Sequence, residues 1–200
     1  DFCLSRGLGD VYKRQITIFR NSEDCQKMSF KEVKLHGSED FPFGLYLIDE
    51  NHPKYEMAFH WHTNAEMIRV KSGSLEITLN NKKRAAKSGD VVFINSEVVH
   101  GATPSNCVYE CLVFPLSYLK SGNRFSNSFI DNLVDKNCHL SPFPEGEEIK
   151  SISDRLFETV KEKKNGYQFI TIGLVNELIG EFLRTCLLYT SPSPRDRQKS

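Results

Sequence analysis

The sequence predicts a mainly β fold, an antiparallel sandwich or barrel, that is followed by C-terminal α-helices. Turn residues recur at short intervals between residues 44 and 114, which is typical of an antiparallel sandwich or barrel. In residues 74–79 apolar side chains alternate with polar ones, as expected for a half-buried strand. After Pro115 the apolar residues recur three and four positions apart instead, which is the spacing of an amphipathic helix.

The expected strands are short and are separated by clear turns. They cover residues 44–48, 57–62, 66–71, 74–79, 84–87, 91–94 and 106–114. Ser72-Gly73 and Ser88-Gly89-Asp90 are expected to be turns, and Asn80-Asn81 is expected to close a hairpin because Asn tolerates left-handed backbone geometry. Residues 91–94 are apolar at every position, which predicts a strand buried on both faces.

Three helices are expected after the barrel. Their apolar stripes are Phe129, Ile130, Leu133 and Val134; Ile149, Ile152, Leu156 and Val160; and Val175, Leu178, Ile179 and Phe182. The second helix is expected to end near Asn165-Gly166, which can adopt a left-handed cap. One side of the third stripe can pack on its own domain. We expect the remaining flank to contact the same helix of a second copy, in a homodimer with two-fold symmetry.

Three histidines and a glutamate occur at a spacing that suggests a binding site. The chain reads H-x-H-x3-E-x6-G from His60 through His62 and Glu66 to Gly73, and G-x10-H from Gly89 to His100. Because side chains alternate across a strand, residues 60, 62 and 66 share a face if the strand stays regular. Imidazole and carboxylate ligands suit zinc, iron, manganese or nickel. The alternative is that these residues hold an organic ligand through hydrogen bonds, without a metal.

These two segments resemble the two halves of the cupin signature. Cupins are small β-barrels, also called double-stranded β-helices, that direct such residues at one interior point. The second half departs from the pattern of cupin enzymes, G-x5-P-x-G-x2-H-x3-N, because Asn95, Glu97 and Pro104 stand at its proline, second glycine and asparagine. The departure argues against catalysis more than against the fold.

Residues 59–119 resemble the N-terminal sensing domain of AraC-type transcription regulators. The similarity is carried by residues 59–62 with Glu66, and by residues 70–73, 87–95 and 99–100. The resemblance implies a barrel that binds a small effector at His60, His62, Glu66 and His100, a sugar being one candidate. It also implies helices that mediate dimerisation and a helix-turn-helix part, outside this sequence, that binds DNA.

The resemblance further implies a cytoplasmic protein that is not an enzyme and requires no cofactor, with a divalent transition metal as the one optional group. The alternative function is a metal-dependent cupin enzyme, such as a dioxygenase or a sugar isomerase. Cys107 and Cys111 are four residues apart, which is not a zinc-binding spacing. Together with Cys25 and Cys138 they are expected to be reduced thiols. No apolar run is long enough to span a bilayer, so no membrane partner is expected.

Neither end of the sequence reads as native protein. Residues 5–15 resemble a translated transposon-end sequencing adapter, and residues 186–200 resemble the translation of its reverse complement. We therefore expect residues 1–15 and 186–200 not to be native, residues 16–119 to form the effector-binding barrel, and residues 120–185 to form a helical dimerisation and linker region. The native protein is expected to continue beyond Thr185. The two ends carry six Lys or Arg and three Asp or Glu, so without them the formal charge of zero becomes −3, which does not favour a nucleic-acid surface.

Overall fold

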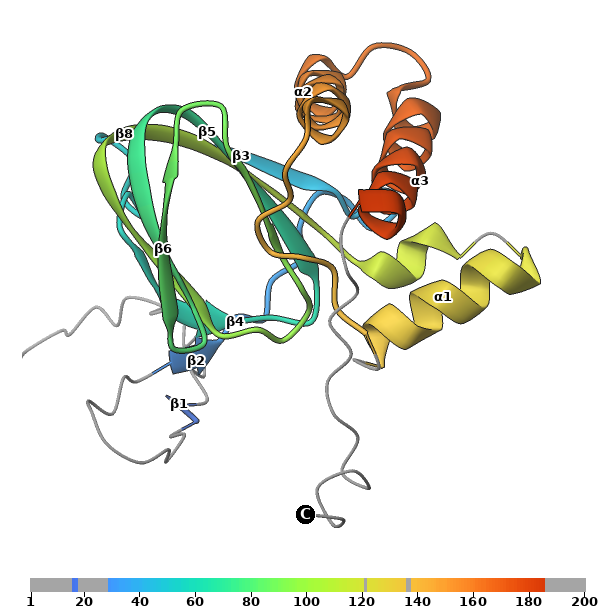
Figure 1. Cartoon of the computed structure of the whole chain (residues 1–200), viewed down its shortest axis with the longest axis horizontal. Helices are drawn as coiled ribbons and strands as arrows, with labels where there is room; N and C mark the ends of the chain where they lie inside the picture. The colour runs from blue at the N-terminus through green and yellow to red at the C-terminus, as the bar shows by residue number, and fades with distance from the viewer. Residues whose placement is uncertain (1–15, 18–28, 121, 136–137, 186–200) are drawn as a thin grey trace, which may run out of the picture.

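The computed structural model describes residues 16–17, 29–120, 122–135 and 138–185. Eight strands in these ranges pair into one sheet that curls into a barrel (Figure 1). The strands are β1 (Ile16–Thr17), β2 (Ser29–Lys31), β3 (Gly44–Ile48), β4 (Met57–Trp61), β5 (Ala65–Leu79), β6 (Lys82–Lys87), β7 (Val91–Ile94) and β8 (His100–Phe114). The predictions made for residues 1–15 and 186–200 lie outside the described residues.

Two long antiparallel strands, β5 and β8, form the centre of the sheet. They pair from Ala65 opposite Phe114 to Leu79 opposite His100. Each strand also pairs with two shorter ones along its other edge. The first half of β5 pairs with β7 and its second half with β6, while the first half of β8 pairs with β4 and its second half with β3. The sheet therefore has two halves that curl toward each other, which is the double-stranded arrangement that the sequence predicted.

The expected strand bounds differ from the structure most in β5 and β8, and by one or two residues in β4 and β6. The turn predicted at Ser72-Gly73 is an irregularity within one continuous strand, β5, whose register against β8 shifts between Val70 and Ser74. Such bulges bend and twist a strand without ending it, so β5 can serve both halves of the barrel. Strand β8 begins at His100 rather than at residue 106, and Pro104 lies inside it, opposite Leu75.

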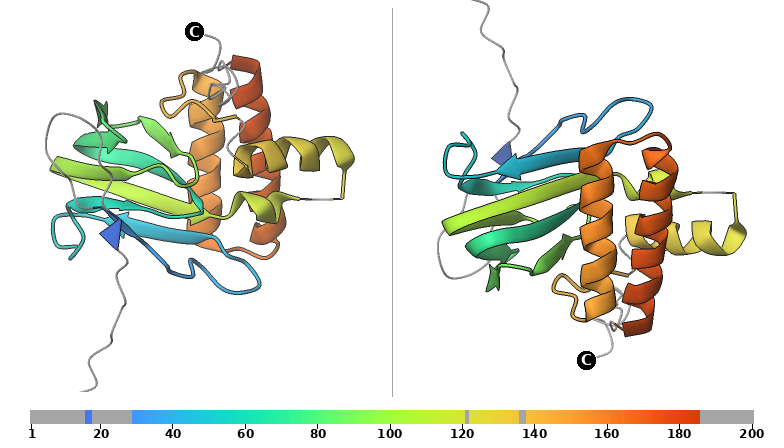
Figure 2. Two further views of the ribbon diagram at one scale, coloured as in Figure 1. Left: turned by 90° about the horizontal axis from the view of Figure 1, so that it is seen from below. Right: turned by 90° about the horizontal axis from the view of Figure 1, so that it is seen from above.

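The helices follow the barrel as predicted. A short 3-10 helix (Leu116–Leu119) leads into α1 (Arg124–Val134), α2 (Glu147–Glu162) and α3 (Tyr167–Thr185). Figure 2 shows α2 and α3 side by side across one face of the barrel. The C-cap of α2 is Lys163, which adopts the left-handed conformation (φ 50°) two residues before the predicted Asn165-Gly166. Within the described ranges, no helix combines the length and apolar character that crossing a bilayer requires.

The chain has two apolar cores, because alternate residues of β5 point to opposite faces. Ile68 and Val70 join the core inside the barrel, whereas Met67 joins the core between the barrel and the helices. The predicted stripe of α3 belongs to this second core: Val175, Leu178, Ile179 and Phe182 are all buried within the chain. For example, the Phe182 ring contacts the Phe93 ring on β7 with centroids 5.4 Å apart.

This burial changes how a dimer through α3 would be built. The four predicted dimerisation residues are already covered by their own domain, so they offer no free flank to a second copy. The exposed large apolar residues of α3 are Phe169 (84% exposed), Ile170 (52%) and Leu183 (39%). The homodimer itself stays a prediction, and these three residues are the ones that a partner could contact.

Candidate functional site

The structure brings His60, His62, Glu66 and His100 together inside the barrel. His60 lies near the end of β4, Glu66 near the start of β5, and His100 is the first residue of β8, directly opposite His60. His62 follows β4 in the turn to β5. One ligand atom from each of the four residues lies within 4.8 Å of the others, and within the described residues they form the group that could hold a metal ion.

Each of the three histidines is oriented by a backbone carbonyl. The Nδ1 atoms of His60, His62 and His100 lie 2.9, 3.1 and 2.8 Å from the carbonyl oxygens of Ala58, Asn64 and Val98. A carbonyl oxygen can only accept a hydrogen bond, so each Nδ1 carries a proton and donates it. In a neutral imidazole the lone pair is then on Nε2. This is the arrangement that fixes the tautomer of a metal-binding histidine.

The carboxylate of Glu66 lies at the centre of the cluster. Its Oε2 is 3.2 Å from His62 Nε2 and 3.3 Å from His100 Nε2. Burial alone would raise the pKa of Glu66, but its contacts with His100 and His62 outweigh burial and hold the pKa well below its usual range. Burial lowers the pKa of His62, yet the hydrogen bond and charge of Glu66 dominate and raise it overall. Glu66 is therefore an anion that faces the Nε2 atoms of His62 and His100. A proton or a metal ion between each nitrogen and the carboxylate would make these contacts favourable.

His100 is not fully satisfied, and the pKa of His60 is lowered. His100 is 1% exposed and its Nε2 has no hydrogen-bond partner. Burial, followed by the proximity of His100, lowers the pKa of His60 to about 4. The His60 and His100 rings are close, with centroids 4.2 Å apart. A cation at this point would use the Nε2 lone pairs of both rings.

A cavity of about 570 Å³ leads from the cluster to the surface. His60 and Glu66 form part of its wall, together with Cys111 and Val113 from β8. The remaining wall comes mainly from β3 and from the segments before β3 and β4: Phe30, Glu32, Lys34, His36, Tyr46, Ile48, His52, Pro53, Lys54, Glu56, Met57 and Ala58. The volume lies within the range of small-molecule binding sites in proteins.

Three residues near the cluster were not found from the sequence. The sequence pattern did not single out His36, which is 4% exposed and whose ring centroid lies 6.1 Å from that of His62. Glu32 lies 3.8 Å from both His36 Nε2 and His60 Nε2, and Lys54 lies 3.2 Å from Glu32. These residues belong to irregular segments, where no periodic pattern marks the side chains that point inward. The i, i+4 spacing of Glu32 and His36, which repeats that of His62 and Glu66, is the one available sequence signal.

The departures from the enzyme pattern have structural roles. Asn95 donates a hydrogen bond to the carbonyl of Leu140 and accepts one from its N–H, both at 2.9 Å, so it ties the barrel to the segment before α2. Glu97 has a φ of 61°, the left-handed geometry that glycine would adopt at this position without strain. Glu97 therefore adopts the backbone conformation that the glycine of the enzyme pattern would favour.

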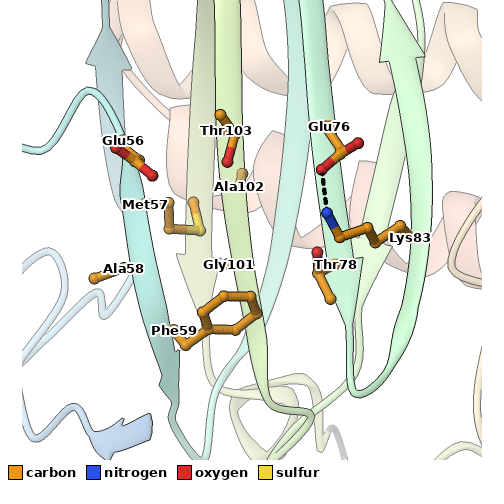
Figure 3. A pocket seen from close by; sticks show the side chains of 10 residues that line it. All are labelled: Glu56, Met57, Ala58, Phe59, Glu76, Thr78, Lys83, Gly101, Ala102 and Thr103. Atoms are coloured by element: carbon orange, nitrogen blue, oxygen red, sulfur yellow. Dashed lines mark hydrogen bonds and ion pairs between the residues drawn. The ribbon is translucent and has the colours of Figure 1, made fainter. Parts of the chain in front are cut away.

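A second hollow, of about 310 Å³, lies on the outer face of the sheet (Figure 3). Phe59 covers Gly101 there, and the Glu76–Lys83 ion pair (2.7 Å) lies across from it. The four residues of the cluster do not line this hollow. It is therefore a separate feature from the cavity that reaches His60.

Residues 42–179 match the family described as the AraC-like ligand binding domain. The chain belongs to this family. The matched region runs from just before β3 into α3, so the AraC-like domain includes the helices as well as most of the barrel. The suspected family and the predicted fold class, a cupin barrel followed by C-terminal helices, are both confirmed.

The AraC-like domain is also similar to parts of other proteins. It is 28% identical over 104 residues to the uncharacterised HTH-type transcriptional regulator YdeC of Bacillus subtilis, covering 50% of this chain and 35% of that protein. The chain thus spans about a third of the length of this relative. A cupin of Methanocaldococcus jannaschii is similar over 57% of this chain and 91% of its own (12% identity, TM-score 0.32). Protein NMB1881 of Neisseria meningitidis is similar over 54% and 88% (11% identity, TM-score 0.31).

Proposed function

We propose that this chain is the effector-sensing and dimerisation domain of an AraC-family DNA-binding transcriptional regulator, with the helix-turn-helix part outside this sequence. The membership of the AraC-like ligand-binding family supports sensing. The name of the Bacillus subtilis relative, an HTH-type regulator of which this chain covers 35%, supports a DNA-binding part elsewhere in the protein. A small molecule, a sugar being one candidate, would then change how two such domains present their DNA-binding parts.

The observation that carries this proposal is the cavity of about 570 Å³ that ends at His60 and Glu66. It joins apolar walls, such as Ile48 and Val113, to a few converging polar groups, which is the usual composition of a small-molecule site. Effector binding here would stabilise the folded domain by mass action. A thermal-shift screen of small molecules tests this. Compounds should raise the melting temperature of the native chain but not that of His60→Phe, in which a larger apolar ring removes a polar wall of the cavity.

Sequencing the gene tests whether the protein has a DNA-binding part. The genomic sequence downstream of the codon for Thr185 should encode two helix-turn-helix patterns. Each would place a recognition helix in the major groove, and a dimer would space the two units for paired half-sites. A stop codon immediately after this codon would contradict the regulator and favour an enzyme.

We also propose that His60, His62, Glu66 and His100 can hold a divalent transition metal. The residues fit such an ion because the Nδ1 atoms are all bonded to carbonyls, and the buried His100 Nε2 makes no hydrogen bond although Glu66 Oε2 lies 3.3 Å away. A metal held here would act as a Lewis acid toward a ligand oxygen in the cavity.

Elemental analysis after gel filtration should find about one ion per chain in zinc-treated protein and much less in Glu66→Gln. His52→Gln, which changes a histidine outside the cluster, should bind as the native chain does. A metal-free result would reject this proposal and leave the effector site intact.

The alternative function is a metal-dependent cupin enzyme, such as a dioxygenase or a sugar isomerase. It is favoured by one observation, the complete set of three histidines and one glutamate within 4.8 Å. Turnover of a substrate that requires the metal, and that is lost in Glu66→Gln, would support the enzyme. Saturable binding of a small molecule without turnover would support the sensor.

A further inference from the structure

One carboxylate, that of Glu32, lines the cavity close to His60. The side chain is 16% exposed. Its Oε1 accepts a hydrogen bond from Lys54 Nζ at 3.2 Å, and its Oε2 lies 3.8 Å from the Nε2 atoms of both His36 and His60. Nitrogen groups from three separate segments therefore surround one carboxylate, beside the cluster that holds Glu66.

The contact between Glu32 and the two imidazoles is incomplete. A separation of 3.8 Å is longer than a hydrogen bond. His36 is 4% exposed and its Nε2 has no hydrogen-bond partner, while its Nδ1 lies 2.9 Å from the hydroxyl of Tyr46. Buried polar atoms of this kind are normally paired. His36 lines the cavity, and its Nε2 lacks a hydrogen-bond acceptor.

We propose that the cavity takes a small carboxylate-bearing molecule, whose carboxylate replaces that of Glu32 between His36 and Lys54. With its proton on Nε2, His36 donates to the incoming carboxylate while Nδ1 accepts from the Tyr46 hydroxyl. Hydrogen bonds that combine a charged donor with a carboxylate are short and strong, so this position suits an anion better than a neutral polyol. The inference rests on the proposed function, because it names the chemical class of the effector.

Glu32 is then an internal competitor of the ligand. Its charge repels a second carboxylate, and its hydrogen bond occupies Lys54 until the ligand arrives. Removing the charge of Glu32 should therefore strengthen the binding of a carboxylate, whereas removing Lys54 should weaken it. A merely structural Glu32–Lys54 ion pair would give neither effect.

Calorimetric titration of the full chain tests the inference with four probes: succinate, its uncharged diamide succinamide, glucose and inorganic phosphate. Succinate should bind the native chain more tightly than the other three probes. It should bind Glu32→Gln about tenfold more tightly than the native chain, and Lys54→Met about tenfold more weakly. Succinamide should show no gain in Glu32→Gln. The matched control is Glu76→Gln, which removes a carboxylate paired with Lys83 on the outer face (Figure 3) and should leave succinate binding unchanged.

The inference is overturned if Glu32→Gln binds succinate no more tightly than the native chain. It is equally overturned if succinamide, glucose or phosphate binds the native chain at least as tightly as succinate, or if none of the four binds. Glucose binding that disappears in His60→Phe would reject the carboxylate but keep the barrel as an effector site. The inference and the proposed function can thus fail separately.

Discussion

At the scale of single residues, the site holds more hydrogen-bond acceptors than donors. Three Nδ1–H groups are committed to backbone carbonyls, so the Nε2 atoms of a neutral cluster are all acceptors, and they face the carboxylate of Glu66. One proton on His62 relieves the contact with Glu66, which is why the pKa of His62 is raised while burial, followed by the nearby His100, lowers that of His60 to about 4. The pKa values of these neighbouring histidines are thus shifted in opposite directions.

The first prediction concerns His60 in metal-free protein. Its folded-state pKa of about 4 lies below the unfolded value of about 6.5, so between these values the unfolded chain binds a proton that the folded chain excludes. His60 therefore lowers the free energy of unfolding as pH falls from about 6.5 to about 4, by up to about 1.4 kcal/mol per pH unit. The raised pKa of His62 acts in the opposite sense, stabilising the fold below its unfolded pKa and losing this effect as pH rises through its folded pKa.

Urea denaturation at several pH values separates these contributions. The difference between the native chain and His60→Gln isolates His60, because the other groups are common to both proteins. The curve for His60→Gln should be flatter over this window than that of the native chain. Parallel curves for the native chain and His60→Gln would show that His60 does not titrate as the structure implies.

At the scale of elements, two features decide how the barrel is built and connected. The first is the bend of β5 at Gly73, which has a φ of 74° and where a Cβ would lie 2.0 Å from the carbonyl oxygen of Asn106. The second is Arg69 on the outer face of β5, which is 4% exposed at its side chain and binds Glu110 on β8 at 2.6 Å. Arg69 also reaches Asp154 and Glu158 on α2 and lies over the Phe157 ring. It therefore joins the barrel to the helices.

The second prediction compares two glycines of the motif. Gly89 also has a positive φ, 87°, but an added Cβ would meet no atom within 4 Å. Gly89→Ala should therefore cost only the backbone strain of about 1–2 kcal/mol. Gly73→Ala should cost at least about 2 kcal/mol more, since the chain must also move away from Asn106. Equal losses in chemical denaturation would show that the two strands can separate at this point without cost.

The third prediction concerns Arg69→Met. The change leaves the buried carboxylate of Glu110 without its partner, so it should lower the free energy of unfolding by about 3–5 kcal/mol. The matched control is Arg84→Met: Arg84 also pairs with a carboxylate, Glu145, and also lies over a ring, Phe143, but it is 54% exposed. Its removal should cost less than about 1 kcal/mol. A small effect at Arg69 in urea denaturation would mean that water or a rearranged side chain satisfies Glu110.

At the scale of the whole molecule, the helices complete the domain. They cover the outer residues of the sheet, such as Met67 and Phe93, and share one apolar core with them. The apolar stripe of α3 that was predicted to contact a second copy packs instead in this core. What α3 leaves exposed is Phe169 and Ile170 in its first turn and Leu183 near its end.

The fourth prediction separates folding from dimerisation. Analytical ultracentrifugation should show that the chain is a homodimer, because the proposed function includes dimerisation. Ile170→Lys should dissociate the dimer with little change in stability, because Ile170 is 52% exposed. Leu178→Glu should instead unfold the domain, because it buries an unpaired charge inside one chain. A native chain that stays monomeric at high micromolar concentration would contradict the dimer, and dissociation by Leu178→Glu with intact folding would restore the original assignment.

The sequence by itself determined the β-then-α order of the fold and the four residues of the cluster. Alternation, turn residues and helical spacing are local properties, so β3 and β7 have the bounds that the pattern predicted. The tertiary structure alone decided that β5 continues through Gly73, because a bulge and a turn both use a glycine with positive φ. It alone placed Glu32, His36 and Lys54 beside the cluster, since irregular segments carry no periodic signal. It also decided that Leu178 and Phe182 are core residues: an apolar stripe requires burial, but the sequence does not specify which surface provides it.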